Sequence, residues 1–426
     1  MKQTENLQLP ILQSGDKYTK ETQNEAFKKV DLHLGGLAKR VNNIVASGGE
    51  SNIEIVDARV DNITGVVYNT IGERINSVSE QLDTKANDLN EQIYTMKKET
   101  EVKNSKVVYK AISGTLNNSS IYIKDTDITH LQNIGADLTL CVMCSVASET
   151  DNNIEIMDNE RVTNTIKRCT AKGVNVNMIK PHIGLNFEDT LNRKNYNPTN
   201  KNLFFENWTN VLLNYAKICD TYNIPLLCIS VEMVELTKNT WADNWKKLYE
   251  DIKAKYPNVK LLHAPKNWEF ADEGNELSLQ YCDILGCTFY SHYTHKSFSK
   301  TDKIDIKELG KSFYYTDDNF RFMELVNTRC KKYNKEFYIM EIGCMALNDG
   351  LTDVVPDSYK STTTRDNFNV QSALMKAFFK YCLPNENIIG FSWWHIRNPF
   401  EFYKDNEITI AEQTMKDYCK RGVVND

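Results

Sequence analysis

Residues 224–232 read Ile-Pro-Leu-Leu-Cys-Ile-Ser-Val-Glu, and residues 337–341 read Phe-Tyr-Ile-Met-Glu. Each stretch is an apolar run that ends in a glutamate. Near-continuous apolar runs are typical of parallel strands that are buried on both faces. Glu232 and Glu341 would therefore stand at the carboxyl ends of two strands, where solvent and ligand begin. The pair predicts a two-carboxylate enzyme built on a barrel.

Further apolar runs of strand length occur from residue 107 to the end of the chain, and helical periodicity fills most of the intervals. Eight strands separated by helices over roughly 320 residues have the size and rhythm of a (β/α)8 TIM barrel. The alternative is a doubly wound sheet, but no Gly-x-Gly-x-x-Gly follows any of the strands. The predicted strands are 107–113, 138–146, 174–180, 226–231, 259–263, 284–290, 337–341 and 388–394, and the predicted helices are 160–172, 204–222, 241–255, 320–333 and 366–381.

The carboxyl ends of the predicted strands carry acidic, basic, amide and aromatic side chains. In a barrel these ends meet on one face. Sugars are bound by such mixtures, because aromatic rings stack on the apolar faces of the sugar while fixed donors and acceptors hold its hydroxyls. The residues expected to line a sugar site, besides the two glutamates, are Lys180, His182, Asn267, Trp268, Tyr290, Trp393 and Trp394, and one of the two adjacent tryptophans should instead pack inward.

Glycosidic cleavage requires two carboxyl groups, one to protonate the leaving oxygen and one to attack or stabilise the anomeric carbon. The ends of the fourth and seventh strands lie across a barrel and could place two carboxyls about 5 Å apart, which is the retaining geometry. Glu232 is then the acid/base and Glu341 the nucleophile. The nucleophile needs partners that keep it ionised, and Lys180, His182 and Tyr290 are the candidates.

Composition excludes several other classes of protein. The net charge of −6 and the absence of long basic runs argue against a nucleic-acid partner. No stretch has the length of a membrane span, and the amino terminus lacks the apolar region of a signal peptide. The 11 cysteines are expected to be reduced core residues. The single Cys141-x-x-Cys144 pair and the His292/His295 loop are weak signals for a metal, so no metal or other cofactor is predicted.

The first 106 residues lack the alternation of strand and helix patterns that the rest of the chain shows. Residues 1–50 contain one helical stretch, 20–45, with apolar residues at three- and four-residue spacing, and are predicted to dock on a partner. Residues 51–106 contain a heptad pattern over 71–96 that predicts a short coiled-coil stalk, with a single amphipathic helix as the alternative. Lys85 and Gln92 would weaken a two-stranded coil, so a trimer is favoured. Residues 107–426 form the barrel.

The sequence around this stalk resembles that of phage structural proteins. Glu-Ile-Val-Asp-Ala-Arg at 54–59 and Tyr-Asn-Thr-Ile-Gly-Glu-Arg-Ile at 68–75 are similar to a linker in tail and baseplate proteins of phages that infect Gram-positive bacteria. The resemblance implies attachment to other virion proteins, and hence a location in the virion after synthesis in the host cytoplasm. From the residues alone, the charges of Asp57, Arg59 and Arg74 would be those of a solvated linker.

The barrel resembles the clan A glycoside hydrolases, and most closely glycoside hydrolase family 113, which contains endo-β-mannanases. The motifs are Lys-Pro-His at 180–182, Cys-Ile-Ser-Val-Glu-Met at 228–233, Glu-Ile-Gly at 341–343 and Phe-Ser-Trp-Trp at 391–394, and they occur in the family's order. The resemblance implies that Glu232 is the acid/base, Glu341 the nucleophile and Tyr290 a hydrogen-bond donor to the nucleophile. Val231 and Met340 depart from the family, which has Thr at both positions.

These observations favour a virion-associated retaining, endo-acting glycosidase that cleaves a bacterial surface polysaccharide. A second hypothesis is a receptor-binding protein that keeps the sugar site but cleaves slowly or not at all, and Val231 and Met340 favour it. A third, a purely structural adaptor, leaves the strand-end aromatic residues without a role. The partners expected are a cell-surface glycan and tail or baseplate proteins.

Overall fold

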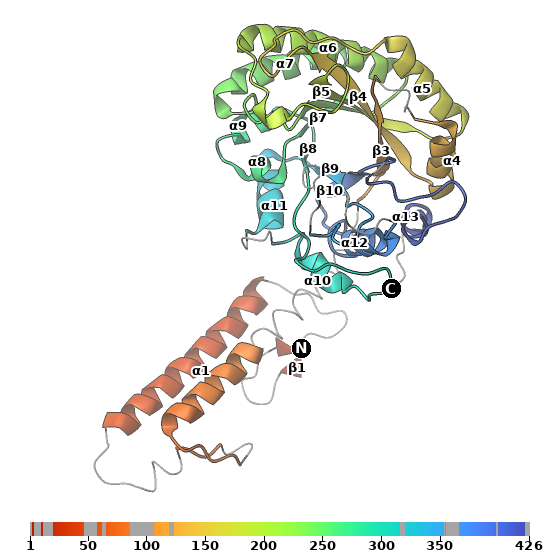
Figure 1. Ribbon diagram of the computed structural model, residues 1–426. Helices are drawn as coiled ribbons and strands as arrows, with labels where there is room; N and C mark the ends of the chain where they lie inside the picture. The colour runs from red at the N-terminus through yellow and green to blue at the C-terminus, as the bar shows by residue number, and fades with distance from the viewer. Residues whose placement is uncertain are drawn as a thin grey trace. The chain divides into compact units, whose positions relative to one another are not determined.

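Figure 1 shows the computed structural model of the chain. The structure describes residues 2–3, 10–11, 20–46, 58–61, 65–85, 106–118, 123–315, 320–352, 354, 366–397 and 399–421. The chain separates into two compact units, Met1–Thr95 and Met96–Asp426. Each unit is described by itself.

The larger unit is a parallel β-barrel surrounded by helices, as the ring of strands in Figure 1 shows. The strands are hydrogen-bonded in the order β7-β6-β5-β4-β3-β10-β9-β8. Parallel bridges from Leu262 to Ile284 and from Lys266 to Thr288 close the ring. The predicted (β/α)8 TIM barrel is therefore confirmed. Its strands are β3 (Tyr109–Leu116), β4 (Asp137–Val146), β5 (Val176–Leu185), β6 (Leu226–Val231), β7 (Lys260–Ala264), β8 (Leu285–Thr288), β9 (Phe337–Ile342) and β10 (Ile388–Trp393).

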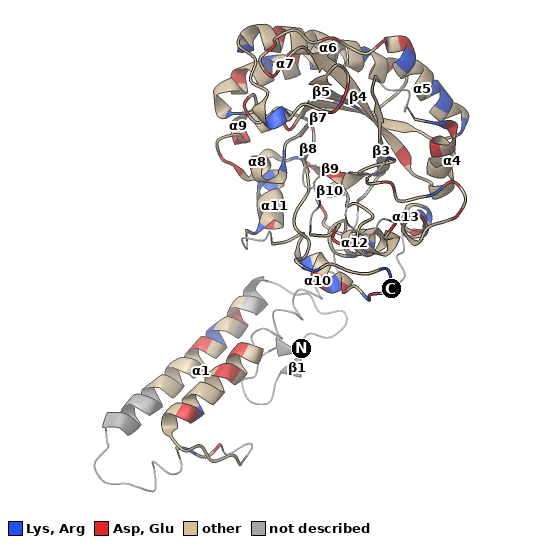
Figure 2. Cartoon of the chain, viewed as in Figure 1, with Lys and Arg blue, Asp and Glu red and all other residues tan. Residues whose placement is uncertain are grey.

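Helices occupy the predicted intervals, and further ones were not anticipated. The predicted helices are α5 (Asn159–Ala171), α6 (Lys201–Thr221), α7 (Ala242–Lys255), α11 (Phe322–Tyr333) and α12 (Phe368–Tyr381). Figure 2 shows basic and acidic residues interspersed along these outer helices. The unanticipated helices are α4 (Asp125–Ile134), α8 (Asn267–Ala271), α9 (Glu276–Leu279), α10 (Ile306–Lys311) and α13 (Ile410–Arg421), with short 3-10 turns η1 (Arg193–Asn195) and η2 (Asn239–Trp241).

Strand β5 is longer than predicted, because it continues through Pro181 to Leu185. Pro181 pairs in register with Val142 of β4, whereas the pairing of β5 with β6 ends at Ile179. Proline has no N–H to give to a ladder, and the ladder with β6 has already ended where that donor is missing. Lys180 and His182 consequently lie within the strand and not beyond it.

The barrel has an apolar filling inside and an apolar layer between strands and helices. The inner cluster closes the barrel and consists of Met178, Leu226, Cys228, Val231, Leu262, Ala264, Ile284, Tyr338, Met340 and Ile389. The two residues that depart from the family, Val231 and Met340, both belong to it and have no exposed surface. All 11 cysteines are unpaired and ten are buried, as predicted.

In the amino-terminal unit the described elements include α1 (Lys20–Ala46) and a helix over 71–85. Arg74 donates to the carbonyl of Ala58 at 2.6 Å and Arg59 to the carbonyl of Asn69 at 2.8 Å, so both arginines link the linker to the start of the second helix. A coiled coil over 71–96 is not shown, and residues 86–96 and the linker residues 54–57 lie outside the described residues. In the described part of the chain, no helix is long and apolar enough to cross a membrane.

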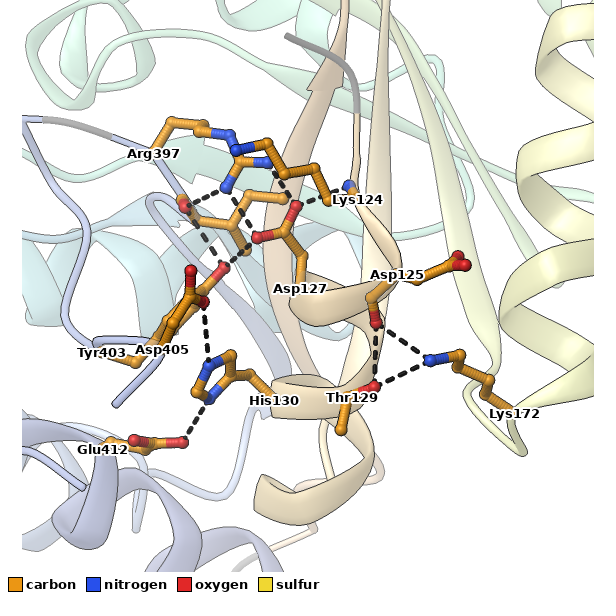
Figure 3. A network of polar contacts seen from close by, with 11 residues as sticks. Lys124, Asp125, Asp127, Thr129, His130, Lys172, Arg397, Tyr403, Asp405 and Glu412 are labelled. Carbon is orange, nitrogen blue, oxygen red and sulfur yellow. Dashed lines mark hydrogen bonds and ion pairs between the residues drawn. The ribbon is translucent and has the colours of Figure 1, made fainter. Parts of the chain in front are cut away.

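A buried ionic network joins α4 to the segment between β10 and α13 (Figure 3). The Asp127 carboxylate, which is 2% exposed, accepts hydrogen bonds from Nη1 of Arg397 at 2.6 Å and from the Tyr403 hydroxyl at 2.8 Å. Close by, Nδ1 of His130 lies 2.7 Å from Oε1 of Glu412 on α13. These contacts fix the last helix of the barrel to the first.

Replacing Asp127 with alanine should unfold the barrel at a lower temperature. The Arg397 guanidinium would be left partly buried without its carboxylate, and breaking such a pair costs about 3–5 kcal/mol. Calorimetry should show this loss, whereas Asp125→Ala on the same helix, which removes an exposed pair with Arg168, should leave the melting temperature nearly unchanged. Equal melting temperatures for the Asp127 variant and wild type would show that the network of Asp127 does not stabilise the barrel.

Candidate active site

Glu341 stands near the end of β9 with two partners from other strands. Its side chain is 7% exposed. One carboxylate oxygen is paired with Nζ of Lys180 on β5, and the other accepts a hydrogen bond of 2.9 Å from the Tyr290 hydroxyl, just after β8. Lys180 is fully buried, so its ammonium has no contact with bulk water and is paired with this carboxylate instead. Both oxygens of Glu341 are thereby held in place.

The charge state of this pair follows from its surroundings. Burial raises the pKa of Glu341, the Lys180 ammonium opposes that effect, and repulsion from Glu232 adds to the rise. Burial lowers the pKa of Lys180, but the charge of Glu341, the thiols of Cys141 and Cys228 and the hydrogen bond to Glu341 together raise the pKa of Lys180 above its usual value. Lys180 is therefore the group that keeps Glu341 ionised, and Glu232 is near enough to interact with Glu341 electrostatically.

Glu232 follows β6 directly, and its surroundings differ from those of Glu341. Its backbone is in the left-handed region, with φ of 52°, and its N–H donates to the carbonyl of Ala264 at 2.9 Å. One carboxylate oxygen accepts a 2.8 Å hydrogen bond from the Thr288 hydroxyl, and the other lies 3.4 Å from Nζ of Lys266. The side chain is 15% exposed and therefore more accessible than that of Glu341.

The structure places His182 and Trp394 beside this pair. Their rings are stacked, with centroids 6.0 Å apart, and Nζ of Lys180 lies 5.7 Å from the centroid of the Trp394 ring. His182 is fully buried and neither ring nitrogen has a hydrogen-bond partner. Burial lowers the pKa of His182, so the imidazole is neutral and supports Trp394 by stacking.

The remaining predicted residues are placed differently. Trp393 has no exposed surface and belongs to the hydrophobic core. The expectation that Trp393 lines the site is therefore wrong, and Trp393 is the one of the two adjacent tryptophans that packs inward. Asn267 and Trp268 begin α8, and Trp268 is half exposed. Lys266, their neighbour, is the residue at this position that lies beside Glu232.

Sequence reasoning missed three residues at the site: Lys266, Thr288 and Arg193. Thr288 is the last residue of β8 and Lys266 lies two residues after β7, so their position at or just beyond the end of a strand was a usable signal. Arg193 lies in η1 between β5 and α6, where no periodic pattern marks it. Its charge lowers the pKa of Glu341, which places it among the groups that act on the nucleophile.

Among the described residues, no cluster of three or more His, Cys, Asp or Glu side chains could hold a metal ion. The chemistry open to these residues is acid–base and nucleophilic catalysis by two carboxyl groups. A buried, cation-paired carboxylate beside a more accessible one is the arrangement that a two-step displacement at a sugar carbon needs.

The model of glycoside hydrolase family 113 matches residues 143–422. The chain belongs to glycoside hydrolase family 113. The match includes Lys180, Glu232 and Glu341, so the family predicted from the sequence motifs is confirmed, and the family 113 barrel is that of a glycoside hydrolase.

Solved structures agree with the family 113 fold. One described as a GH113 β-1,4-mannanase has a TM-score of 0.55 at 14% identity, covering 74% of this chain and 99% of its own. The GH113 β-mannanase of Alicyclobacillus acidocaldarius, in complex with ManMIm, has a TM-score of 0.55 at 11% identity, covering 75% of this chain and 98% of its own. No curated protein sequence matches the chain. At these identities the structures show the fold alone.

Lys180→Met should move the acidic limb of the pH–rate profile to higher pH. The nucleophile must be ionised, so activity is lost as the pH falls through the pKa of Glu341. Removing the ammonium that lowers this pKa raises it, by about one unit or more for a buried partner. Lys110→Met is the matched control, because Nζ of Lys110 donates to the carbonyl of Cys419 at 3.2 Å, away from the site. An unshifted limb in the Lys180 variant would refute this role.

Proposed function

We propose that this family 113 barrel is a retaining, endo-acting glycosidase that cleaves a bacterial surface polysaccharide, with Glu341 as nucleophile and Glu232 as acid/base. The observation that carries the proposal is the unequal surroundings of the two strand-end carboxyls. Glu341 is buried between Lys180 and Tyr290, whereas Glu232 is more accessible and has Thr288 and Lys266 as partners. Retaining glycosidases require such a division of roles.

The proposed reaction has two steps. Glu341 attacks the anomeric carbon while Glu232 donates its proton to the leaving glycosidic oxygen, which gives a glycosyl ester on Glu341. Glu232, now ionised, then takes a proton from a water molecule that attacks the same carbon and releases Glu341. The hydrogen bond from Tyr290 orients the nucleophile, and Trp394 offers an aromatic face close to it.

The names of the solved relatives suggest the first polymers to test. One is described as a β-1,4-mannanase and the other as a β-mannanase, so a β-1,4-linked backbone of mannose type is the starting point for this chain. Two of the four motifs that the chain shares with the family lie at the strands of the two glutamates, and the other two lie on β5 and β10. A glycan of the bacterial envelope with such a backbone is the proposed substrate.

Wild-type protein should release new reducing ends from host cell-wall or capsule polysaccharide, and Glu341→Gln should not. The glutamine keeps the size of the side chain but cannot form the glycosyl ester, so the rate should fall by at least about 10³-fold. Mass spectrometry of the products measures the cleavage and identifies the sugar. Release that persists unchanged in the variant would rule out Glu341 as nucleophile.

A catalytically weak receptor-binding protein on the same fold is the second candidate. Val231 and Met340, which replace two threonines of the family, are packed in the apolar filling of the barrel and offer no hydroxyl to a substrate or carboxylate. Retained binding of the polysaccharide by wild type and variant, with no cleavage by either, would favour this candidate.

We further propose that the amino-terminal segment attaches the enzyme to a phage tail or appendage. Phe27, Leu34 and Leu37 of α1 are each at least 40% exposed, which supports docking of this helix on another chain. Display of several barrels on one particle would convert weak sugar binding into stable adsorption. The partners are then tail or baseplate proteins, and the location is the virion.

The proposed stalk predicts that the full chain is an oligomer, with a trimer favoured by Lys85 and Gln92 in the heptad positions. Light scattering of residues 1–426 should give a multiple of the monomer mass, whereas residues 107–426 should be monomeric. A monomeric mass for both lengths of chain would rule out an oligomerising coiled-coil stalk.

A further inference from the structure

Lys266 is the charged partner of Glu232, the proposed acid/base. It lies two residues after β7, and its Nζ is 3.4 Å from Oε2 of Glu232. The side chain of Lys266 is 30% exposed and that of Glu232 is 15% exposed. The other carboxylate oxygen, Oε1, accepts the 2.8 Å hydrogen bond from the Thr288 hydroxyl. Both oxygens of Glu232 therefore have a partner, and of the two partners Lys266 is the one that carries a charge.

Backbone contacts join these partners to one another. Lys266 and Thr288 form a parallel bridge just beyond β7, and the N–H of Thr288 donates to the carbonyl of Pro265 at 2.8 Å. The N–H of Glu232 donates to the carbonyl of Ala264 at 2.9 Å. The carboxyl of Glu232 and both of its partners are thus tied to the same short stretch, residues 264–266.

A buried carboxyl, that of Glu269, fixes the backbone of Lys266. Glu269 has no exposed surface and lies in the first turn of α8. Its Oε2 accepts a hydrogen bond of 3.1 Å from the Lys266 N–H, and its Oε1 accepts one from the Thr237 hydroxyl. Burial raises the pKa of Glu269 to about 7, although these two hydrogen bonds oppose the rise. A buried carboxyl is costly, and the contact with Lys266 is the one that bears on the site.

The balance of charge at Glu232 changes when the glycosyl ester forms. Glu232 is repelled by Glu341 and Glu269, and it is attracted by Arg193 and by Lys266, which lies in contact with it. Among these charges only that of Glu341 is lost in the proposed reaction. In the first step this charge favours a proton on Glu232, which the leaving oxygen needs. Once Glu341 is esterified, attraction to Lys266 favours the ionised form of Glu232, which is the form that accepts a proton from water.

We propose that Lys266 is a positioning residue of the second step: its ammonium keeps Glu232 ionised while the glycosyl ester is hydrolysed, and Glu269 holds Lys266 in place. In this step the water oxygen bonds to the anomeric carbon, the ester bond to Glu341 breaks and leaves its electron pair on that carboxylate, and the proton of the water passes to Glu232. The inference rests on the proposed function, because it assigns Lys266 and Glu269 a part in the same two-step reaction.

The ionisation of Glu232 can be followed without a substrate in the full chain carrying Glu341→Gln, which lacks the charge of Glu341 as the glycosyl ester does. Carbon-13 NMR of labelled glutamate carboxyls should show Glu232 taking up its proton at a pH higher by about 0.5 to 1 when Lys266→Met is added. Glu232→Gln identifies the signal. Lys238→Met is the control, because it removes another lysine paired with a glutamate, Glu235, in the connection that follows β6, and it should change nothing.

Kinetics with 2,4-dinitrophenyl β-mannobioside isolates the second step. Its phenolate leaves without a proton, so hydrolysis of the glycosyl ester limits the rate and only that step needs Glu232. On the acidic limb of the kcat profile, Lys266→Met should lower kcat and KM together by about threefold to tenfold and leave kcat/KM nearly unchanged. A merely structural loss would lower kcat/KM as well. Lys266→Arg keeps the charge and should recover most of kcat.

Two variants of Glu269 test its hold on Lys266 in the same assay. Glu269→Gln keeps an acceptor for the Lys266 N–H, and on the acidic limb, below a pKa of about 7, glutamine is the neutral counterpart of a carboxyl that is mostly protonated. It should behave as wild type. Glu269→Leu removes the acceptor and should lower kcat and KM together, as Lys266→Met does. The Thr237 hydroxyl keeps an acceptor in the leucine variant, because the carbonyl of Met233 lies 3.3 Å away.

The outcomes separate this inference from the proposed function. An unshifted titration of Glu232, or a Lys266→Met variant whose kcat/KM falls as far as its kcat, would overturn the role of Lys266. A folded Glu269→Leu variant with wild-type kinetics would overturn the role of Glu269. If the wild type cleaves neither the mannobioside nor the polysaccharides, the proposed activity fails. A shifted titration would then still support the hold of Lys266 on Glu232, and an unshifted one would overturn it.

Discussion

The buried ion pair between Lys180 and Glu341 is the constraint on which the site depends. Lys180 is fully buried and Glu341 is 7% exposed, so neither charge is satisfied by bulk water. Taking two such charges out of water costs several kcal/mol per ion unless their geometry is good and further hydrogen bonds complete it. Tyr290 supplies one of these bonds. Because the three residues come from β5, β9 and the end of β8, the pair is stable only while these strands hold their places in the ring.

The apolar filling of the barrel provides that rigidity. Val231 and Met340 precede the two catalytic glutamates, and both point into the filling. A residue that follows an inward-pointing strand residue would face the surrounding helices if the strand continued. The chain instead turns at Glu232, whose φ of 52° is in the left-handed region, and the carboxyl is directed toward Thr288 and Lys266. This conformation costs about 1–2 kcal/mol for a residue with a Cβ, and such strain is concentrated at functional sites.

The barrel, the two glutamates and two of the three expected partners of Glu341, Lys180 and Tyr290, could be predicted from the sequence, because each depends on a local pattern. The third expected partner, His182, makes no hydrogen bond through its ring. A buried parallel strand is a run of apolar residues, and a polar residue at its end marks the open face of the barrel. Lys266, Thr288 and Arg193 were missed because their roles depend on distance in space and not on spacing in the chain. The extension of β5 through Pro181 was missed for a related reason, since only the pairing with β6 shows that the absent N–H costs no hydrogen bond there. Trp393 and Trp394 are adjacent, and which of them packs inward depends on the register of β10.

The two carboxyls differ because of how the barrel surrounds each of them. Glu341 needs a cation within the barrel, and Lys180 supplies it from β5, the strand beside β6 in the ring. One cation is sufficient to keep one nucleophile ionised. Glu232 has a hydroxyl and a lysine as neighbours and is about twice as exposed as Glu341, so it is the carboxyl that the leaving oxygen and the attacking water can reach.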